Sequence, residues 1–373
     1  MTGHAPRDMH APQGTLALTL LIDVGERIDL AQAESRVRSA GREGRRLTLT
    51  RGEAQSSIRI PVAPLILDLP DDQVGKASEL PSGWTETLQV ALYDFGVFSC
   101  RRILSWPRSV AWPELVSVGA DLIHRTDMRS WAEPLAITVE SLLGPAIQER
   151  ERSPMREEYA ILRLDHEPSS GITEAELTCL LLGEARVLST GARESLLGRE
   201  FRYTELDRTI VAYDAALVVE PDPADHDVEL LIEFANAQLL ELEVYDAILE
   251  TRLPQLESRA AAMGVGPGAL FARRTQRIVT EVHRLTAKTS RLIQQATSAL
   301  RITDDIYLAR IYRAVLDVMN EPAWRQSVER KLTLARTLAE SLNDMAVAAR
   351  AEALEIIIVV LILGELLLSL ARR

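Results

Sequence analysis

Hydrophobic residues are distributed differently in the two parts of the chain, and the change falls near residue 228. Before it, short apolar runs are bounded by turn residues, which is typical of strands that alternate with short helices. The runs predict strands over 16–23, 45–50 and 57–60, a helix over 30–40, a strand-rich stretch over 85–105, and a helix from Trp112 with Pro113 in its first turn. Residues 1–150 are therefore predicted to form a first α/β unit.

A second α/β unit is predicted over residues 151–227. Its pattern indicates a strand over 158–165, a helix over 173–188, strands over 199–206 and 209–220, and a turn-rich end at 221–227. A Tyr-Asp pair stands in a strand-like run of each unit, at residues 93–94 and 213–214. The paired motif suggests the hypothesis that the body contains duplicated β-α-β units.

From residue 228 to 352 the apolar residues recur at helical spacing, which predicts a helical stalk. Two stretches step by alternating four and three residues, the spacing that keeps one side of a coiled-coil helix facing a partner. The first seam comprises positions 278, 282, 285, 289, 292, 296 and 299, and the second seam comprises 328, 332, 335, 339, 342, 346 and 349. We expect the seams to pair in a hairpin, so the fold class is α+β, with an α/β body followed by a helical stalk.

The last stretch, residues 353–373, contains the almost wholly aliphatic run LEIIIVVLILGELLLSLARR. A helix over 356–371 would be about 24 Å long, somewhat short of the ~30 Å hydrocarbon core. We predict a single-pass C-terminal transmembrane anchor in which Glu365 and Ser369 form a polar strip that prefers a neighbouring helix to lipid. The residues assigned to this anchor and to homo-oligomer contacts are Leu354, Glu355, Ile358, Leu361, Ile362, Glu365 and Ser369. The alternative is a helix buried at a subunit interface of a soluble oligomer.

Composition narrows the choice of partners and compartment. A net charge of −12 and a pI near 5.2 argue against direct nucleic-acid binding, which needs a clustered basic face. Cys100 and Cys179 lie far apart, as expected of reduced thiols in the cytosol. The N-terminal sequence has no signal-peptide pattern. We therefore expect a tail-anchored protein on the cytoplasmic face of the inner (cell) membrane, with lipid and an unidentified protein as partners.

Candidate chemistry is sparse. The chain has no P-loop, dinucleotide fingerprint or nucleophile elbow, and the adjacent Asp304 and Asp305 suit a helix start. GVGPG at 264–268 suits a hinge better than a phosphate loop, because Pro267 lacks a backbone donor. PDPADHD at 221–227 suits a linker better than a metal site. We therefore predict no catalytic, cofactor-binding or metal-binding residue.

Several motifs resemble those of a known family. They are YDFG with Tyr93, Asp94, Phe95 and Gly96; the helix FANAQLLELEVYD; YLARIY with Tyr307, Leu308, Ala309, Arg310 and Tyr312; Trp324; and the terminal LE pair. In this order they resemble the required-for-meiotic-nuclear-division family, also called domain of unknown function 155. Ile356 stands where relatives usually carry tryptophan, so the chain resembles a divergent, bacterial member.

The resemblance implies a membrane-anchored, oligomeric protein without known enzymatic activity, whose mitochondrial relatives sit at the inner membrane and support organellar translation. The main functional hypothesis is thus a non-enzymatic scaffold or interaction protein. One alternative is a soluble, oligomeric regulatory or nucleotide-responsive enzyme. Another is a peripheral adaptor whose tail lies along the membrane interface.

Overall fold

The computed structural model describes residues 10–47, 62–69, 80–184, 186, 188–197, 199–261, 275–287, 289–290 and 306–371. The chain divides into two compact units. Unit 1 consists of Met1–Glu241 and Gln295–Pro322, and unit 2 consists of Leu242–Gln294 and Ala323–Arg373.

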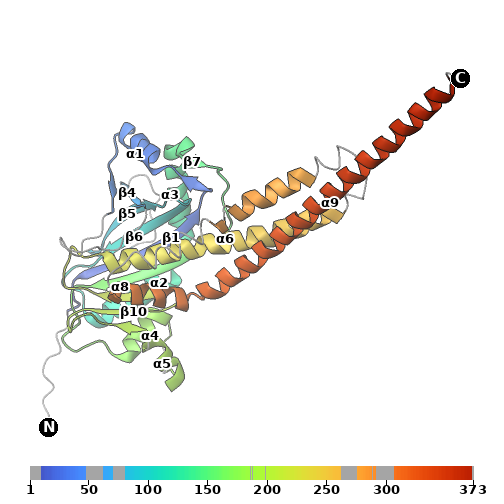
Figure 1. Cartoon of the computed structure of the whole chain (residues 1–373). Coiled ribbons are helices and arrows are strands. Elements are labelled where there is room, and N and C mark those ends of the chain that lie inside the picture. The colour runs from blue at the N-terminus through green and yellow to red at the C-terminus, as the bar shows by residue number, and fades with distance from the viewer. Residues whose placement is uncertain are drawn as a thin grey trace, which may run out of the picture. The chain divides into compact units, whose positions relative to one another are not determined.

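Unit 1 is built on a nine-stranded sheet with the order β3-β4-β5-β6-β1-β8-β11-β10-β9 (Figure 1). Its strands are β1 (Gly14–Asp23), β3 (Gly44–Arg46), β4 (Leu65–Leu69), β5 (Thr85–Leu92), β6 (Val97–Ser105), β8 (Arg156–Leu164), β9 (Glu200–Phe201), β10 (Arg208–Val211) and β11 (Ala215–Val219). β2 (Arg27–Ile28) and β7 (Ile147–Gln148) form a separate two-stranded ribbon.

Helices lie on both faces of this sheet. They are α1 (Leu30–Ser39), α2 (Trp112–Arg125), α3 (Met128–Leu143), the 3₁₀ turn η2 (Gly144–Ala146), α4 (Glu174–Leu182), α5 (Thr190–Leu197), the first part of α6 (Asp227–Ala261) and α8 (Ile306–Val318). In the central strand β1, Leu16, Leu18 and Leu20 point into the apolar core beneath α1–α4. Thr19 is paired with Arg101 in the sheet register, so both point to the opposite face, which α6 covers.

Local sequence signals explain where several helices begin and end. Asp29 caps α1 through its carboxylate, and Pro113 occupies the first turn of α2. Thr173 and Glu176 form a reciprocal capping box at the start of α4, and Gly183 ends that helix in the left-handed conformation. The predicted strands 16–23 and 158–165 and the predicted helix 30–40 are confirmed as β1, β8 and α1.

The predicted duplicated β-α-β units are not found in the described part of unit 1. Repeated β-α-β units would give parallel neighbours, whereas seven of the eight strand pairs in the large sheet are antiparallel. The exception is β8 with β11. Both Tyr-Asp pairs stand at hairpin turns, but Tyr93 is buried and Tyr213 is exposed. The predicted strand 57–60 lies outside the described residues.

In unit 2, the second part of α6, a helical segment over 275–287 and α9 (Glu321–Ala371) from Ala323 onward pack together. Ile278 and Val282 of the first seam share a buried cluster with Ala335, Ala339 and Leu342 of the second. The described seam positions are thus confirmed as buried, apart from Leu285, which is half-buried. α6 adds Leu253 and Leu256 to this cluster, so the packing is not a simple two-helix hairpin. α8, placed in the stalk by its sequence, instead belongs to unit 1.

The predicted transmembrane anchor is wrong. Among the described residues, no helix combines the length and the apolar character needed to span a bilayer. The aliphatic run is the end of the long helix α9, and its described apolar side chains, from Ile356 to Leu368, extend over only about 20 Å at 1.5 Å per residue. Glu365 interrupts them. The prediction of a tail-anchored protein at the cytoplasmic face of the inner membrane is wrong for the same reason.

Gly96 provides a test of the β5–β6 turn. Its φ is +99°, and a Cβ added there would lie 1.8 Å from the carbonyl oxygen of Gly25. We expect Gly96→Ala to destabilise unit 1 by more than about 2 kcal/mol in thermal or chemical denaturation, because backbone strain and a backbone clash add. Gly171→Ala is the matched control, since Gly171 has φ +69° with nothing within 4 Å of the added Cβ. Equal losses in the two variants would show that the close approach to Gly25 does not exist.

Candidate functional site

The YDFG motif forms the turn between β5 and β6. The Tyr93 amide donates to the Val97 carbonyl at 2.9 Å and the Gly96 amide to the Tyr93 carbonyl at 3.2 Å, which closes the turn. The ring of Tyr93 stacks on Phe95 with centroids 5.3 Å apart, and Phe234 of α6 lies 6.1 Å from both rings. The structure therefore brings the YDFG motif and the FANAQLL helix together.

Behind these rings lies a buried ion pair between the sheet and α6. Glu233 of α6 accepts hydrogen bonds from the Tyr93 hydroxyl at 2.8 Å and from Nη2 of Arg101 at 2.7 Å, and Nε of Arg101 lies 2.6 Å from its second oxygen. Burial and the Glu233 carboxylate hold the pKa of Tyr93 well above its usual value. Burial alone would lower the pKa of Arg101, but Glu233 and Tyr93 outweigh it and raise that pKa. The three groups form a buried contact that ties α6 to the sheet.

The start of α6 is held by Arg163 of β8. Its guanidinium donates to the Asp222 carbonyl at 2.6 Å, to the Asp225 carbonyl at 2.5 Å and to Oε1 of Glu229 at 2.7 Å. Backbone carbonyls of the acidic loop 221–227 thus surround the guanidinium of Arg163.

In the described part of the chain, no group of three or more His, Cys, Asp or Glu side chains is placed to hold a metal ion.

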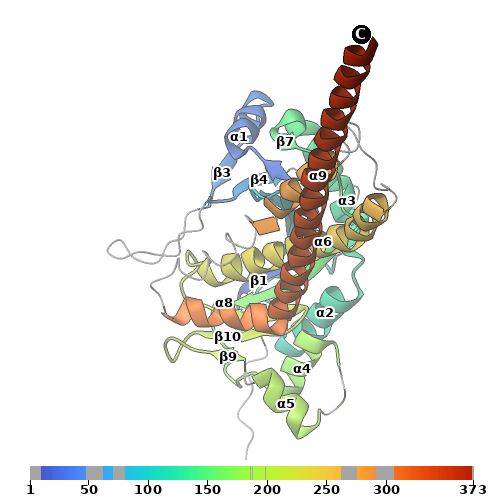
Figure 2. The same cartoon turned by 45° about the vertical axis from the view of Figure 1, so that its right-hand side comes forward.

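The YLARIY motif lies on α8, which runs beside β10 (Figure 2), and makes a second set of contacts within unit 1. The Tyr307 hydroxyl donates to Oδ2 of Asp207 at 2.9 Å. Asp207 also accepts hydrogen bonds from the Tyr203 amide at 2.8 Å and from the Thr204 amide and hydroxyl. These donors outweigh the effect of burial and lower the pKa of Asp207. The Tyr312 hydroxyl donates to the side-chain oxygen of Gln238, which ties α8 to α6.

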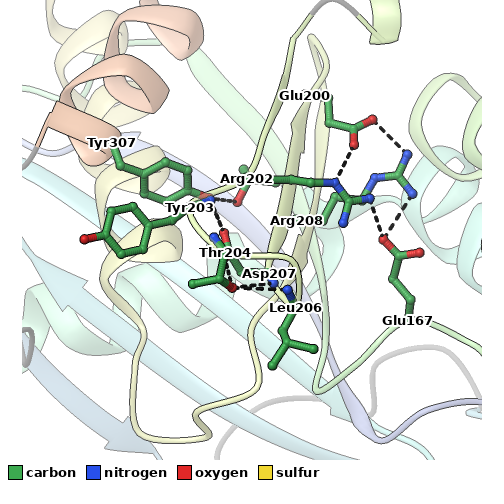
Figure 3. Close-up of polar contacts among 10 residues, drawn as sticks. Glu167, Glu200, Arg202, Tyr203, Thr204, Leu206, Asp207, Arg208 and Tyr307 are labelled. Atoms are coloured by element: carbon green, nitrogen blue, oxygen red, sulfur yellow. Dashed lines mark hydrogen bonds and ion pairs between the residues drawn. The ribbon is translucent and has the colours of Figure 1, made fainter.

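A ladder of ion pairs lies next to this contact (Figure 3). Arg202 donates to Glu200 at 3.0 Å and to Glu167 at 2.9 Å, and Arg208 bonds the same two carboxylates at 2.8 and 3.3 Å. Two arginines are therefore neutralised by two glutamates at the β9–β10 edge of the sheet.

The remaining motif residues are dispersed. Leu308 is buried, Asp94 and Ala309 are half-buried, Arg310 is exposed, and Trp324 lies in unit 2. Arg101, Asp207, Glu233 and Gln238 were missed from the sequence. A charged residue inside an apolar run, such as Glu233 in LLIEFANAQLL, was the sequence signal that could have indicated a buried ion pair.

The predicted oligomer-contact residues lie along the end of α9 in unit 2. Leu354, Glu355, Ile358, Leu361, Ile362 and Glu365 are all exposed. The side chain of Ser369 lies outside the described part of the structure, as do GVGPG at 264–268 and the pair Asp304 and Asp305. The expected polar strip of Glu365 and Ser369 therefore stays a prediction.

Two buried carboxyl groups, those of Asp23 and Glu241, lie near each other where α6 leaves unit 1. Asp23 ends β1 and accepts a hydrogen bond from the Gly25 amide at 3.2 Å. Oε1 of Glu241 is buried without a hydrogen-bond partner in the described structure. Burial raises the pKa of Asp23 to about 7, with Arg156 opposing the shift and Glu151 adding to it. Burial and then Asp23 raise the pKa of Glu241 well above its usual value.

The comparisons with known proteins agree with the extent of the sheet. The sequence profile of the family described as "Uncharacterized protein MJ0711, N-terminal domain" matches residues 13–226. The chain belongs to this family. The MJ0711 N-terminal domain match runs from just before β1 to the residue preceding α6, so it covers every strand of the large sheet. No curated protein and no solved structure matches the chain.

The buried ion pair predicts an order of stability losses. Glu233→Ala leaves Arg101 buried without its carboxylate, which we expect to cost about 3–5 kcal/mol in chemical denaturation. Tyr93→Phe removes one hydrogen bond while Glu233 keeps its ion pair, and should cost about 1–2 kcal/mol. Glu34→Ala, which removes the ion pairs of a half-exposed glutamate with Arg38 and Arg46, is the control and should change stability by less than about 1 kcal/mol. A loss for Glu233→Ala as small as that of the control would contradict the buried pair.

The carboxyl pair predicts a pH dependence. Because the pKa of Asp23 is raised on folding, the folded state binds this proton more tightly, and stability falls as pH rises from the usual pKa of 3.8 to about 7. The shift corresponds to on the order of 4 kcal/mol. We expect Asp23→Asn to raise the thermal midpoint relative to the unmodified chain at about pH 8 and to change it little at about pH 4. The exposed Asp121→Asn is the control, and an equal pH effect in both variants would refute the assignment.

Proposed function

We propose that this protein is a non-enzymatic interaction protein that assembles into homo-oligomers through the end of α9. One observation carries the proposal. From Ile356 to Leu368, every large apolar side chain of α9 is exposed in the single chain, by 48% at Ile356 and up to 66% at Leu367. A surface of this kind is normally covered by a partner.

The distribution of these side chains favours several copies over one neighbour. Eight consecutive residues, 356–363, are Ile, Val or Leu. At 3.6 residues per turn they cover the whole circumference of the helix. A single partner helix covers one face and leaves the others in water, whereas a bundle of identical helices covers most of them. Each side chain that becomes fully buried contributes about 1.5–3 kcal/mol.

The resemblance noted in the sequence supports the same proposal. The YDFG and YLARIY motifs resemble those of the required-for-meiotic-nuclear-division family, whose members form oligomers and have no known enzymatic activity. The motif tyrosines Tyr93, Tyr307 and Tyr312 act here as structural contacts between elements of unit 1. A body held together by its motif residues, with an exposed association helix, suits a scaffold better than a catalyst.

The proposal is tested by the mass of the full chain in sedimentation velocity. We expect the unmodified protein to sediment at several times the chain mass of 41.4 kDa. Ile358→Asp with Leu361→Asp should return it to the monomer mass, since each buried charge costs more than one apolar contact contributes.

Leu334→Asp is the control on the same helix, because Leu334 is 57% exposed but lies outside the apolar run. It should leave the assembly intact. A monomeric unmodified chain, or dissociation by Leu334→Asp alone, would rule out association through the end of α9.

A further inference from the structure

A hollow of about 340 Å³ opens in unit 1 beside α8 and β9. Its walls are Arg199, Phe201, Arg310, Arg313, Ala314 and Asp317. The four residues from α8 follow at spacings of three, one and three, so they lie on one face of the helix. The volume falls within the range of small-molecule sites.

The charge of this hollow is unusual for the molecule. Three guanidinium groups line it, and no ion pair or side-chain hydrogen bond of the described structure engages Arg199, Arg310 or Arg313. Nearby, at the same edge of the sheet, Arg202 and Arg208 are both neutralised by glutamates. A local excess of positive charge in a chain of net charge −12 indicates a site for an anion.

The scaffold behind the hollow is fixed. α8 is held by the hydrogen bonds of Tyr307 to Asp207 and of Tyr312 to Gln238, on the turns that also carry Arg310 and Arg313. The backbone positions of Arg310 and Arg313 are therefore set before a ligand binds, so that only their side chains have to be ordered on binding.

We propose that this hollow binds a nucleoside phosphate. Arginine guanidinium groups match the oxygens of a phosphate group and bind it by charge-assisted hydrogen bonds. Phe201 offers an aromatic face for a base, and Asp317 offers a hydrogen-bond acceptor for ribose hydroxyls. Because the Asp317 carboxylate would repel a ligand that is anionic throughout, it favours a ligand with a neutral sugar next to the phosphate.

Isothermal titration of the full chain with ADP tests the proposal, with pyrophosphate and adenosine as separate ligands. We expect ADP to bind more tightly than either fragment. Arg310→Ala with Arg313→Ala should weaken ADP binding at least about tenfold, and the corresponding lysine pair should weaken it less.

Arg38→Ala with Arg125→Ala is the matched control, because it removes the same charge from two arginines that are 78% and 80% exposed. It should leave ADP affinity unchanged. Absence of ADP binding at about 1 mM, or equal weakening in the control, would overturn the site. Pyrophosphate binding as tightly as ADP would overturn the nucleoside assignment.

Discussion

The arrangement of unit 1 depends on the carboxylate of Glu233 and the two groups that neutralise it. An ionised carboxylate buried between a sheet and a helix is tolerated only where its partners sit at hydrogen-bond distance. Arg101 of β6 and Tyr93 of the β5–β6 turn meet it from the sheet. Because a shift of α6 by one residue would separate these groups, the contact fixes the register of the helix on the sheet.

The fixed register extends to α8. Once Glu233 is placed, Gln238 lies five residues further along the same helix, where it accepts the hydrogen bond of Tyr312. Tyr307, on the same helix as Tyr312, reaches Asp207 in the chain between β9 and β10. The α8 face that carries Arg310 and Arg313 is therefore positioned through two buried tyrosines, and the basic hollow is a consequence of how α6 docks.

The sequence predicted the positions of individual helices and strands better than it predicted which strands and side chains pair. Apolar runs located β1, β8 and the start of α4, because these signals act within a few residues. The helix predicted to reach residue 188 instead ends at Leu182, because Gly183 adopts the left-handed conformation. Strand direction is set by connections across the whole body, so the antiparallel sheet was not foreseen. Glu233 and Arg101 are 132 residues apart in the sequence, and neither segment carries a signal that predicts contact with the other. At the end of α9, the sequence shows that the side chains are apolar, but it does not identify what covers them.

The carboxyl pair lies at the point where α6 leaves unit 1. Glu241 is the last residue of α6 that belongs to unit 1, and its carboxyl lies buried near Asp23. If both groups ionised, two desolvated negative charges would oppose each other, offset in part by the hydrogen bond from the Gly25 amide to Asp23 and by Arg156. Protonation of the pair removes that repulsion and allows this turn of α6 to stay packed on β1. The ion pair with Arg101 thus anchors α6 at Glu233, whereas about two turns later, at Glu241, the packing of the helix depends on a proton.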